Sequence, residues 1–323
     1  MSIVKVDADV PAPFGQALHR PECVLPMPSG DVFVPDWRGG VAVVRADGST
    51  QCWLANSKKV DLKPNGIAFF PNGDFLIASL GKEGGVWRLD CAGNLTAVLT
   101  ELDGTPLPPA NFVYVDEEAR IWITVSTRHQ PRQSAWRQTI SDGFVVLLDR
   151  KGARVVADGL HYTNEARVDP SGCFLYVIET FGRRLVRYPI QGSGLGQKDI
   201  AIQLDTGYLP DGFTFDEEGG IWITSLVSNC LLRADRDGHV QIVIAETNKD
   251  WVAEVEAAYA QNRMAREHLG PIPKTRFQHL TSIGFGGPDR TTAYLGSLHA
   301  DCLYKFTANV AGARQPYWDY PLP

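Results

Sequence analysis

Two separate stretches of the chain read almost alike: PANFVYVDEEARIWIT, from Pro109 to Thr124, and PDGFTFDEEGGIWIT, from Pro210 to Thr224. Aligning them on Asn111 and Asp211 reveals four more units in which a polar residue precedes a short apolar strand, a turn and a second apolar strand. The six polar anchor residues, one per unit, are Glu22, Asn65, Asn111, Asn164, Asp211 and Ser282. This internal repeat predicts a chain built from six copies of one β-unit.

Each unit continues with a third strand, as in GGVAVVRADG or NCLLRADRDG, and the first five units add a fourth apolar run. Four short antiparallel strands per unit are typical of a propeller blade, whose sheet needs neighbours to cover both faces. We therefore predict an all-β fold, a six-bladed β-propeller that forms a single domain over residues 1–323. The sixth unit lacks a clear outer strand, and we expect Ser2 to Val6 to supply it and close the ring.

The distance from Asp211 to Ser282 is longer than the other spacings, and the excess lies at about residues 246–279. Trp251, Val255 and Tyr259 recur every four residues there, which indicates a helix. Asp250 is the expected N-cap, and Gly270 with the proline after it is the expected stop. This helical insertion between blades five and six is either a surface decoration or a lid over a pocket.

Composition excludes several classes of partner. A formal net charge of -6 and a pI near 5.7 provide no cationic surface for nucleic acid or an anionic membrane. No signal-like or membrane-spanning apolar run occurs, so we expect a cytoplasmic protein that acts on a small molecule. The oligomeric state is left open.

Other sequence features favour structural roles. The six cysteines have no metal-ligand spacing, and we expect small buried side chains. The two DEE runs, at Asp116 and Asp216, are expected to be solvated turn tips. No serine-hydrolase or nucleotide-binding motif is present, so neither mechanism has support.

The anchors predict a metal site. Inner strands of a propeller surround its axis, so six polar side chains at equivalent positions should converge at one end of the channel. Two of them, Glu22 and Asp211, are carboxylates that would repel each other without a cation between them. Carboxylate and amide oxygens suit one divalent cation, with Ca²⁺ favoured and Mn²⁺ or Zn²⁺ as alternatives.

Almost the whole chain resembles the senescence marker protein, gluconolactonase and luciferin-regenerating enzyme family of six-bladed propellers. The resemblance runs from RPECVLPMPSGDVFVPD through PDGFTFDEEGGIWIT to LTSIGFGG. It implies that Glu22, Asn164 and Asp211 hold the metal and that Asn111 binds substrate or a metal-bound water. It also implies that Asp211 has a second role as general base.

The chain departs from the family pattern at several positions. Sugar-acid lactonases of the family carry Arg and Asp where this chain has Pro109 and Phe112, and Gly is common where it has Glu165. The family's substrate-binding Glu falls near His129. We therefore expect Asn111, Phe112, His129 and Glu165 to contact a substrate less hydroxylated than a sugar lactone. His161, three residues before the fourth anchor, is a further candidate for the pocket.

These patterns predict a divalent-metal-dependent hydrolase of a lactone or ester, with Asp211 and Asn111 as catalytic residues. A lyase or isomerase on the same metal site is an alternative, because a polarised carbonyl also favours proton transfer at the neighbouring carbon. A third possibility is a non-catalytic binding propeller. Such a protein would not need polar residues at its anchors.

Overall fold

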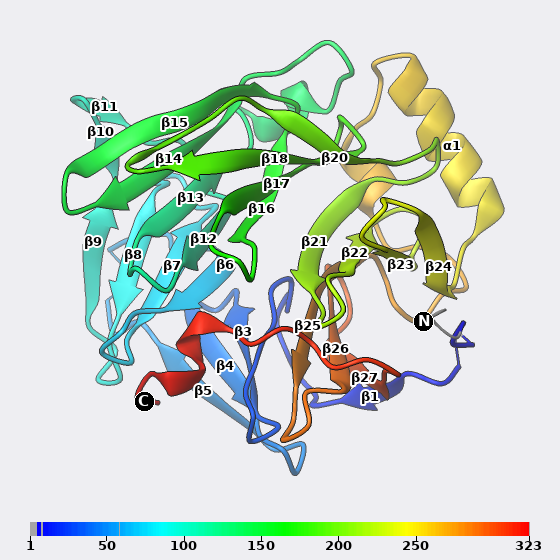
Figure 1. Cartoon of the computed structure of the whole chain (residues 1–323), viewed down its shortest axis with the longest axis horizontal. Helices are drawn as coiled ribbons and strands as arrows, with labels where there is room; N and C mark the ends of the chain where they lie inside the picture. Colours follow the sequence, from blue (N-terminus) through cyan, green and yellow to red (C-terminus); the bar gives the residue numbers. More distant parts are fainter. Residues whose placement is uncertain (1–4, 8, 58, 323) are drawn as a thin grey trace.

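A computed structural model describes residues 5–7, 9–57 and 59–322, whose strands form a six-bladed β-propeller (Figure 1). In blades one to five the innermost strand comes first along the chain and antiparallel partners follow outward, whereas blade six takes its outermost strand from the N-terminal part of the chain. Blades one to three consist of β2 (Leu25–Pro26), β3 (Val32–Asp36), β4 (Gly40–Val44) and β5 (Thr50–Leu54); β6 (Pro64–Phe69), β7 (Phe75–Ser79), β8 (Val86–Leu89) and β9 (Leu95–Leu99); and β12 (Phe112–Val115), β13 (Ile121–Val125), β14 (Gly143–Asp149) and β15 (Gly152–Leu160).

The other three blades follow the same order. They consist of β16 (Thr163–Val168), β17 (Phe174–Glu179), β18 (Arg184–Gln191), β19 (Gly194–Leu195) and β20 (Asp199–Gln203); β21 (Pro210–Phe215), β22 (Ile221–Ser225), β23 (Cys230–Ala234) and β24 (Val240–Ala245); and β25 (Leu280–Gly286), β26 (Thr292–Ser297) and β27 (Leu303–Thr307) with β1 (Ala12–Phe14). A small hairpin, β10 (Glu101–Leu102) and β11 (Thr105–Pro106), follows blade two. The predicted number of blades is confirmed.

Blade six is closed by the N-terminal part of the chain, but the predicted closing residues were wrong. Strand β1 lies beside β27 (Figure 1), and the two strands pair with Phe14 opposite Leu303. Of the segment expected to close the ring, residues 2–4 lie outside the described residues, and the Val6 amide donates to Val243 of β24 in blade five. The strand Ala12–Phe14 was not predicted because it contains a proline. Proline has no amide hydrogen, so within a sheet it is tolerated only in an edge strand such as this one.

The repeated DEE turns contain a buried aspartate, so their assignment as fully solvated tips was wrong. Asp116 and Asp216 are both buried, and each accepts a hydrogen bond of 2.8 Å from the indole nitrogen of a tryptophan six residues later, Trp122 or Trp222. Both tryptophans are fully buried in their blades. The two similar stretches therefore form the same contact, in which a buried tryptophan of the sheet donates a hydrogen bond to the aspartate of the turn.

The insertion contains a shorter helix than predicted. Helix α1 (Lys249–Ala260) begins after Asn248, whose side chain caps the Trp251 amide, so Asp250 lies in the first turn. It ends because Asn262 adopts a left-handed conformation, which directs two backbone amides back to helix carbonyls as in a Schellman motif. The short 3-10 helix η2 (Arg266–Leu269) follows. No helix in the described part of the chain is long and apolar enough to cross a membrane.

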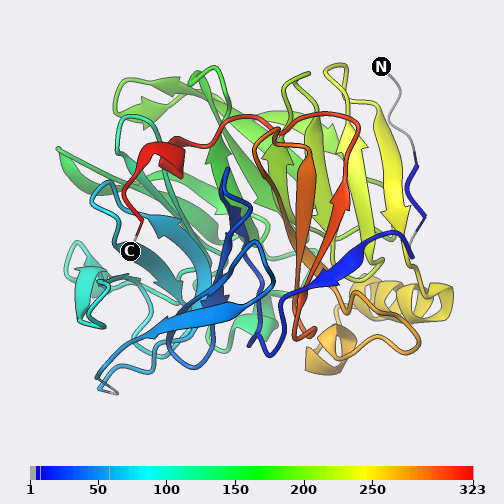
Figure 2. The same cartoon turned by 90° about the horizontal axis from the view of Figure 1, so that it is seen from below.

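The two ends of the propeller differ. The insertion lies at one end, whereas the 3-10 helix η3 (Pro316–Asp319) lies near the other (Figure 2). There the Tyr317 hydroxyl and the Trp318 indole donate to the Pro26 carbonyl at 3.2 and 2.8 Å. The C-terminal segment thus packs against the innermost strand of blade one.

Candidate functional site

The innermost strands are irregular where the anchors occur. In blades two, four, five and six the pairing of the first two strands shifts register at or beside the anchor. A β-bulge of this kind redirects a side chain, because it inserts an extra residue opposite the partner strand. In blade four, Asn164 and the next residue, Glu165, consequently both line the same cavity.

Five of the six anchors line one cavity of about 110 Å³. Its lining residues are Arg20, Glu22, Cys23, Asn65, Gly66, Leu80, Asn111, Phe112, Arg132, Trp136, Tyr162, Asn164, Glu165, Asp211, Leu226, Leu269, Thr281 and Leu298. The sixth anchor, Ser282, is fully buried, and its hydroxyl donates to the Glu165 carboxylate at 3.1 Å. The predicted convergence of the anchor side chains is therefore present in the structure.

Three anchors form a hydrogen-bonded row. The side-chain amide of Asn111 donates to the amide oxygen of Asn164 at 2.7 Å, and the amide of Asn164 donates to the Asp211 carboxylate. The side-chain amide of Asn65 also contacts this row, because it donates to the Asn111 backbone carbonyl at 2.9 Å. The row holds two amides and a carboxylate in fixed relation across blades three to five.

Asp211 is buried and has no ion-pair partner among the described residues. Burial raises the pKa of this carboxyl well above its ordinary value, and the charges of Glu22 and Glu165 raise it further. Arg20 and Arg132 partly offset that rise. A carboxylate in this position is stabilised in its charged form by a bound cation, because an unpaired buried charge is costly.

The donor set fits a divalent cation. Glu22 and Asp211 contribute carboxylates and Asn164 an amide oxygen, which are the ligand types of hard cations such as Ca²⁺. The Glu22 carboxylate is also held by the Arg20 guanidinium at 2.7 Å, and that guanidinium stacks on Trp37 at 3.9 Å from the ring centroid. Arg20 therefore compensates one of the two carboxylate charges and leaves Asp211 as the unneutralised group.

Glu165 occupies space that a glycine in the next blade leaves free. A Cβ atom on Gly212 would lie 2.8 Å from the Glu165 carboxylate and 2.5 Å from the Thr281 carbonyl. This close approach explains the glycine of the PDG unit. The Glu165 carboxylate is held by the buried Arg167 guanidinium at 2.9 Å. Burial nevertheless raises the pKa of Glu165.

Comparison with known proteins identifies the family. The model of the SMP-30/gluconolactonase/LRE-like region matches residues 33–255. The chain belongs to this family. Among curated relatives, strictosidine synthase-like protein 13 of Arabidopsis thaliana is 26% identical over 195 residues, covering 56% of this chain and 46% of that protein. The chain thus spans about half the length of that relative.

Solved structures share the fold across nearly the whole chain. The calcium-binding protein regucalcin from Agrobacterium tumefaciens has a TM-score of 0.70 at 18% identity, covering 98% of this chain and 99% of its own. A gluconolactonase from Xanthomonas campestris has a TM-score of 0.65 at 17% identity, covering 95% and 98%. At these identities the likeness shows the six-bladed arrangement of the family.

The family resemblance and the sequence also suggested two histidines, which the structure does not bring to the cavity. His129 is half-exposed, and its ring nitrogen lies 2.8 Å from the Asp142 carboxylate. His161 lies in a separate outer groove beside Arg183 and Glu256, and burial lowers its pKa. Phe112 and Glu165, by contrast, do line the cavity.

Sequence reasoning missed several residues of the cavity wall, among them Arg20, Arg132 and Trp136. Arg132 begins the 3-10 helix η1 (Arg132–Ala135) in the connection between β13 and β14, and it donates to the Asn111 side-chain oxygen at 2.7 Å. A guanidinium thus reaches the third anchor although Pro109 replaces the family's arginine. The unusual length of that connection was the available signal.

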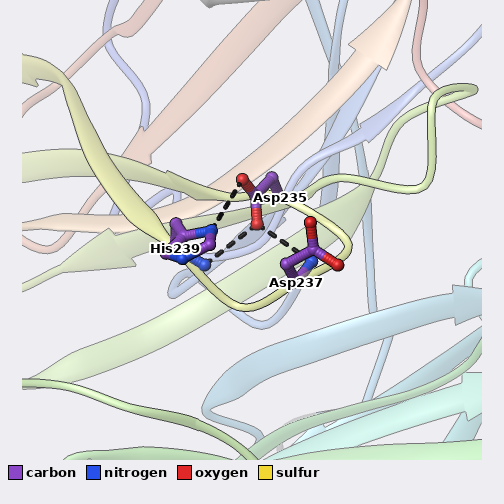
Figure 3. A group of neighbouring side chains, drawn as sticks. All are labelled: Asp235, Asp237 and His239. Carbon is purple, nitrogen blue, oxygen red and sulfur yellow. Dashed lines mark hydrogen bonds and ion pairs between the residues drawn. The ribbon is translucent and has the colours of Figure 1, made fainter.

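A second group of potential metal ligands lies on the exposed turn between β23 and β24 (Figure 3). Asp235 accepts hydrogen bonds of 2.9 Å from the backbone amides of Asp237 and His239. Asp90 makes the same kind of contacts in the β8–β9 turn, to Ala92 and Asn94. The cluster is therefore explained by turn formation.

Proposed function

We propose that this protein is a divalent-metal-dependent hydrolase of a lactone or ester. The observation that carries the proposal is the buried Asp211 carboxylate, which has no ion-pair partner among the described residues and lies beside the oxygen donors Glu22 and Asn164. Membership of a family named for gluconolactonase supports the same reaction class.

Each residue of the row has a chemical task in this proposal. Glu22, Asn164 and Asp211 would hold the cation, which when bound would supply polarisation of a substrate carbonyl and stabilisation of the oxyanion. Asp211 accepts a proton from the attacking water and returns it to the alkoxide oxygen that is released when the acyl C–O bond breaks; a placed base of this kind contributes roughly 10² to 10⁴ in rate. Asn111 orients that water or the substrate, since Arg132 and Asn164 fix both ends of its amide.

The remaining wall favours a substrate with few hydroxyl groups. Leu80, Leu226, Leu269 and Leu298 line the cavity together with the aromatic residues Phe112, Trp136 and Tyr162. Leucine side chains offer no hydrogen bonds to a polyol, and they keep bulk water from the reacting groups. The cavity is also smaller than the roughly 300–1,000 Å³ typical of sites for drug-sized ligands.

Metal analysis of the purified protein tests the site. After mild chelation and re-addition of Ca²⁺, Mn²⁺ or Zn²⁺, we expect one bound ion per chain. Glu22→Gln and Asp211→Asn should each weaken its binding at least tenfold. Asp235→Asn is the matched control, because it removes a carboxylate from the β23–β24 turn. Undiminished metal binding by Glu22→Gln and Asp211→Asn would show that the assignment is wrong.

The reaction is tested with a panel of lactones and aryl esters. We expect hydrolysis that requires metal and proceeds without a covalent intermediate. An acyl-enzyme adduct in the mass spectrum, or full turnover by metal-stripped protein, would contradict the mechanism. Metal-dependent isomerisation or elimination without hydrolysis would favour the lyase or isomerase alternative, and metal binding without turnover of any kind would favour a binding propeller.

A further inference from the structure

Three buried polar atoms in the cavity wall have no hydrogen-bond partner in the described structure. They are Arg132 Nε, the indole nitrogen Nε1 of Trp136 and the hydroxyl of Thr281. Two of them, on Arg132 and Trp136, are obligate donors that come from the same connection between β13 and β14. Buried donors are normally paired. These two belong to side chains that line the cavity, so a ligand bound there is a candidate source of the missing acceptor.

Charge pairing in the cavity leaves one arginine without a carboxylate. Arg20 pairs with Glu22, and Arg167 pairs with Glu165. Arg132 instead donates through one terminal nitrogen to two neutral oxygens, Asn111 Oδ1 at 2.7 Å and Ser126 Oγ at 2.9 Å. No ion pair to Arg132 is found in the described ranges. A divalent cation beside Asp211 would give the cavity a surplus of positive charge.

We propose that the substrate carries a carboxylate that binds Arg132 and the Trp136 indole, next to the lactone or ester bond that is cleaved. This inference rests on the proposed function and narrows its substrate class. A carboxylate supplies acceptor oxygens for both unpaired donors and neutralises the guanidinium.

The position of Arg132 restricts how the substrate is arranged. Arg132 contacts Asn111, and Asn111 contacts the candidate metal ligand Asn164, which in turn contacts Asp211. One amide side chain, that of Asn111, therefore lies between the anion site and the candidate metal ligands. A carboxylate at Arg132 and a carbonyl at the candidate metal ligands are therefore close enough to belong to one small molecule. The Arg132 guanidinium also lies 5.5 Å from the Tyr162 ring centroid, which adds an aromatic surface for the substrate ring.

The test compares two substrates that differ in charge. One is a five-membered lactone with a carboxylate on the ring, and the other is the same lactone with a carboxamide. We expect the parent enzyme to favour the carboxylate by about 10- to 100-fold in kcat/KM, the range typical of a charge-assisted hydrogen bond. Arg132→Gln should remove that preference, Arg132→Lys should retain part of it, and Trp136→Phe should reduce it severalfold. The readout is the ratio of kcat/KM for the carboxylate to that for the carboxamide. Absolute activity is unsuitable because loss of Arg132 also removes a hydrogen bond to Asn111.

The matched control is Arg128→Gln, on the same connection, whose guanidinium pairs with Asp158 outside the cavity. It should keep the preference of the parent. If the carboxamide is hydrolysed as well as the carboxylate, the inference is wrong while the hydrolase proposal stands. The inference is also wrong if Arg132→Gln leaves the ratio of kcat/KM for the two substrates unchanged.

Calorimetry separates the two proposals. The probe is tetrahydrofuran carboxylate, which has the ring and the charge but no lactone carbonyl, and it is titrated into metal-free and metal-loaded protein. We expect binding in both forms, weakened at least tenfold by Arg132→Gln and not by Arg128→Gln. If this binding occurs while no lactone or ester is hydrolysed, the anion site stands and the hydrolase proposal fails. If the probe does not bind to either form, the anion site is overturned.

Discussion

Glu165 and Arg167 form an ion pair buried in the middle of the propeller. Both side chains are almost fully buried, and the Glu165 carboxylate also accepts hydrogen bonds from Ser282 and the Phe213 amide. The Arg167 guanidinium lies 5.2 Å from the Phe112 ring centroid. Because the pair joins blades three, four, five and six, its loss affects the centre of the molecule.

We predict that Arg167→Met destabilises the protein by about 3–5 kcal/mol, since it leaves a buried carboxylate unpaired. The double variant Glu165→Gln with Arg167→Met should recover most of that loss, because no charge then remains buried. Urea denaturation at neutral pH measures both. If the double variant is no more stable than the single one, the pair acts through packing instead of charge compensation.

The sequence predicted the residues that repeat and missed those that do not. The anchors were found because each occupies the same place in a unit, and this periodicity also gave the blade number. Arg132 and Trp136 lie on a connection with no equivalent in other blades, so no pattern could place them at Asn111. His129 failed to reach the cavity for the same reason: position along an irregular connection does not determine where a side chain points.

The helical insertion contributes to the cavity through the end of η2. Leu269 lines the cavity, and the Arg137 side chain on the β13–β14 connection donates to the Met264 carbonyl of the insertion at 2.8 Å. Val255 and Tyr259 of α1 pack with Phe181 and other apolar residues of the propeller. The insertion is thus joined to both the wall of the cavity and the outside of the blades.

We predict that Leu269→Ala changes KM and selectivity among acyl groups severalfold, because it enlarges the cavity at its apolar wall. Ile272→Ala is the control: Ile272 is buried in the same insertion but does not line the cavity, so its loss should lower stability and leave selectivity unchanged. Steady-state kinetics on the lactone and ester panel measure the difference. Identical selectivity in parent and Leu269→Ala would indicate that the insertion is a surface decoration.

His279 attaches the insertion to blades five and six. It is fully buried, and its ring nitrogens lie 3.2 Å from the Leu226 carbonyl and 2.8 Å from the Gly270 carbonyl. Burial lowers the pKa of this imidazole from 6.5 to about 4; the neighbouring His299 acts in the same direction, and the contacts with the Gly270 and Leu226 carbonyls oppose it. The folded protein therefore holds His279 neutral, whereas the unfolded chain takes up a proton at higher pH.

We predict that the free energy of unfolding falls as pH is lowered from about 6.5 to about 4, with His279 contributing on the order of 3 kcal/mol. The stability is present above the unfolded pKa and is lost as pH approaches the folded value. His279→Asn should flatten this slope, and Asn suits the left-handed backbone at this position. Urea titrations at several pH values provide the measurement, and an equal slope in parent and variant would exclude His279 as the cause.

At the scale of the whole molecule, the six blades form a closed ring around the candidate site. The anchors come from different blades, so the geometry of the metal ligands depends on every blade keeping its place. Glu22 belongs to the first blade, whereas Asn164 and Asp211 belong to the fourth and fifth. A small shift between blades would therefore change the ligand distances, although no blade by itself carries the site.

The pairing of Phe14 with Leu303 has a consequence for the order of assembly. Blades one to five consist of contiguous segments, whose strands pair across short loops. Blade six is complete only when β1 pairs with β27, and this seam between distant parts of the chain has a larger loop-closure entropy. We expect this seam to form last. In pulse-labelled hydrogen exchange during refolding, amides of β27 that pair with β1 should gain protection after those of β22 and β23. Simultaneous protection would mean that the ring closes in the same step that forms its blades.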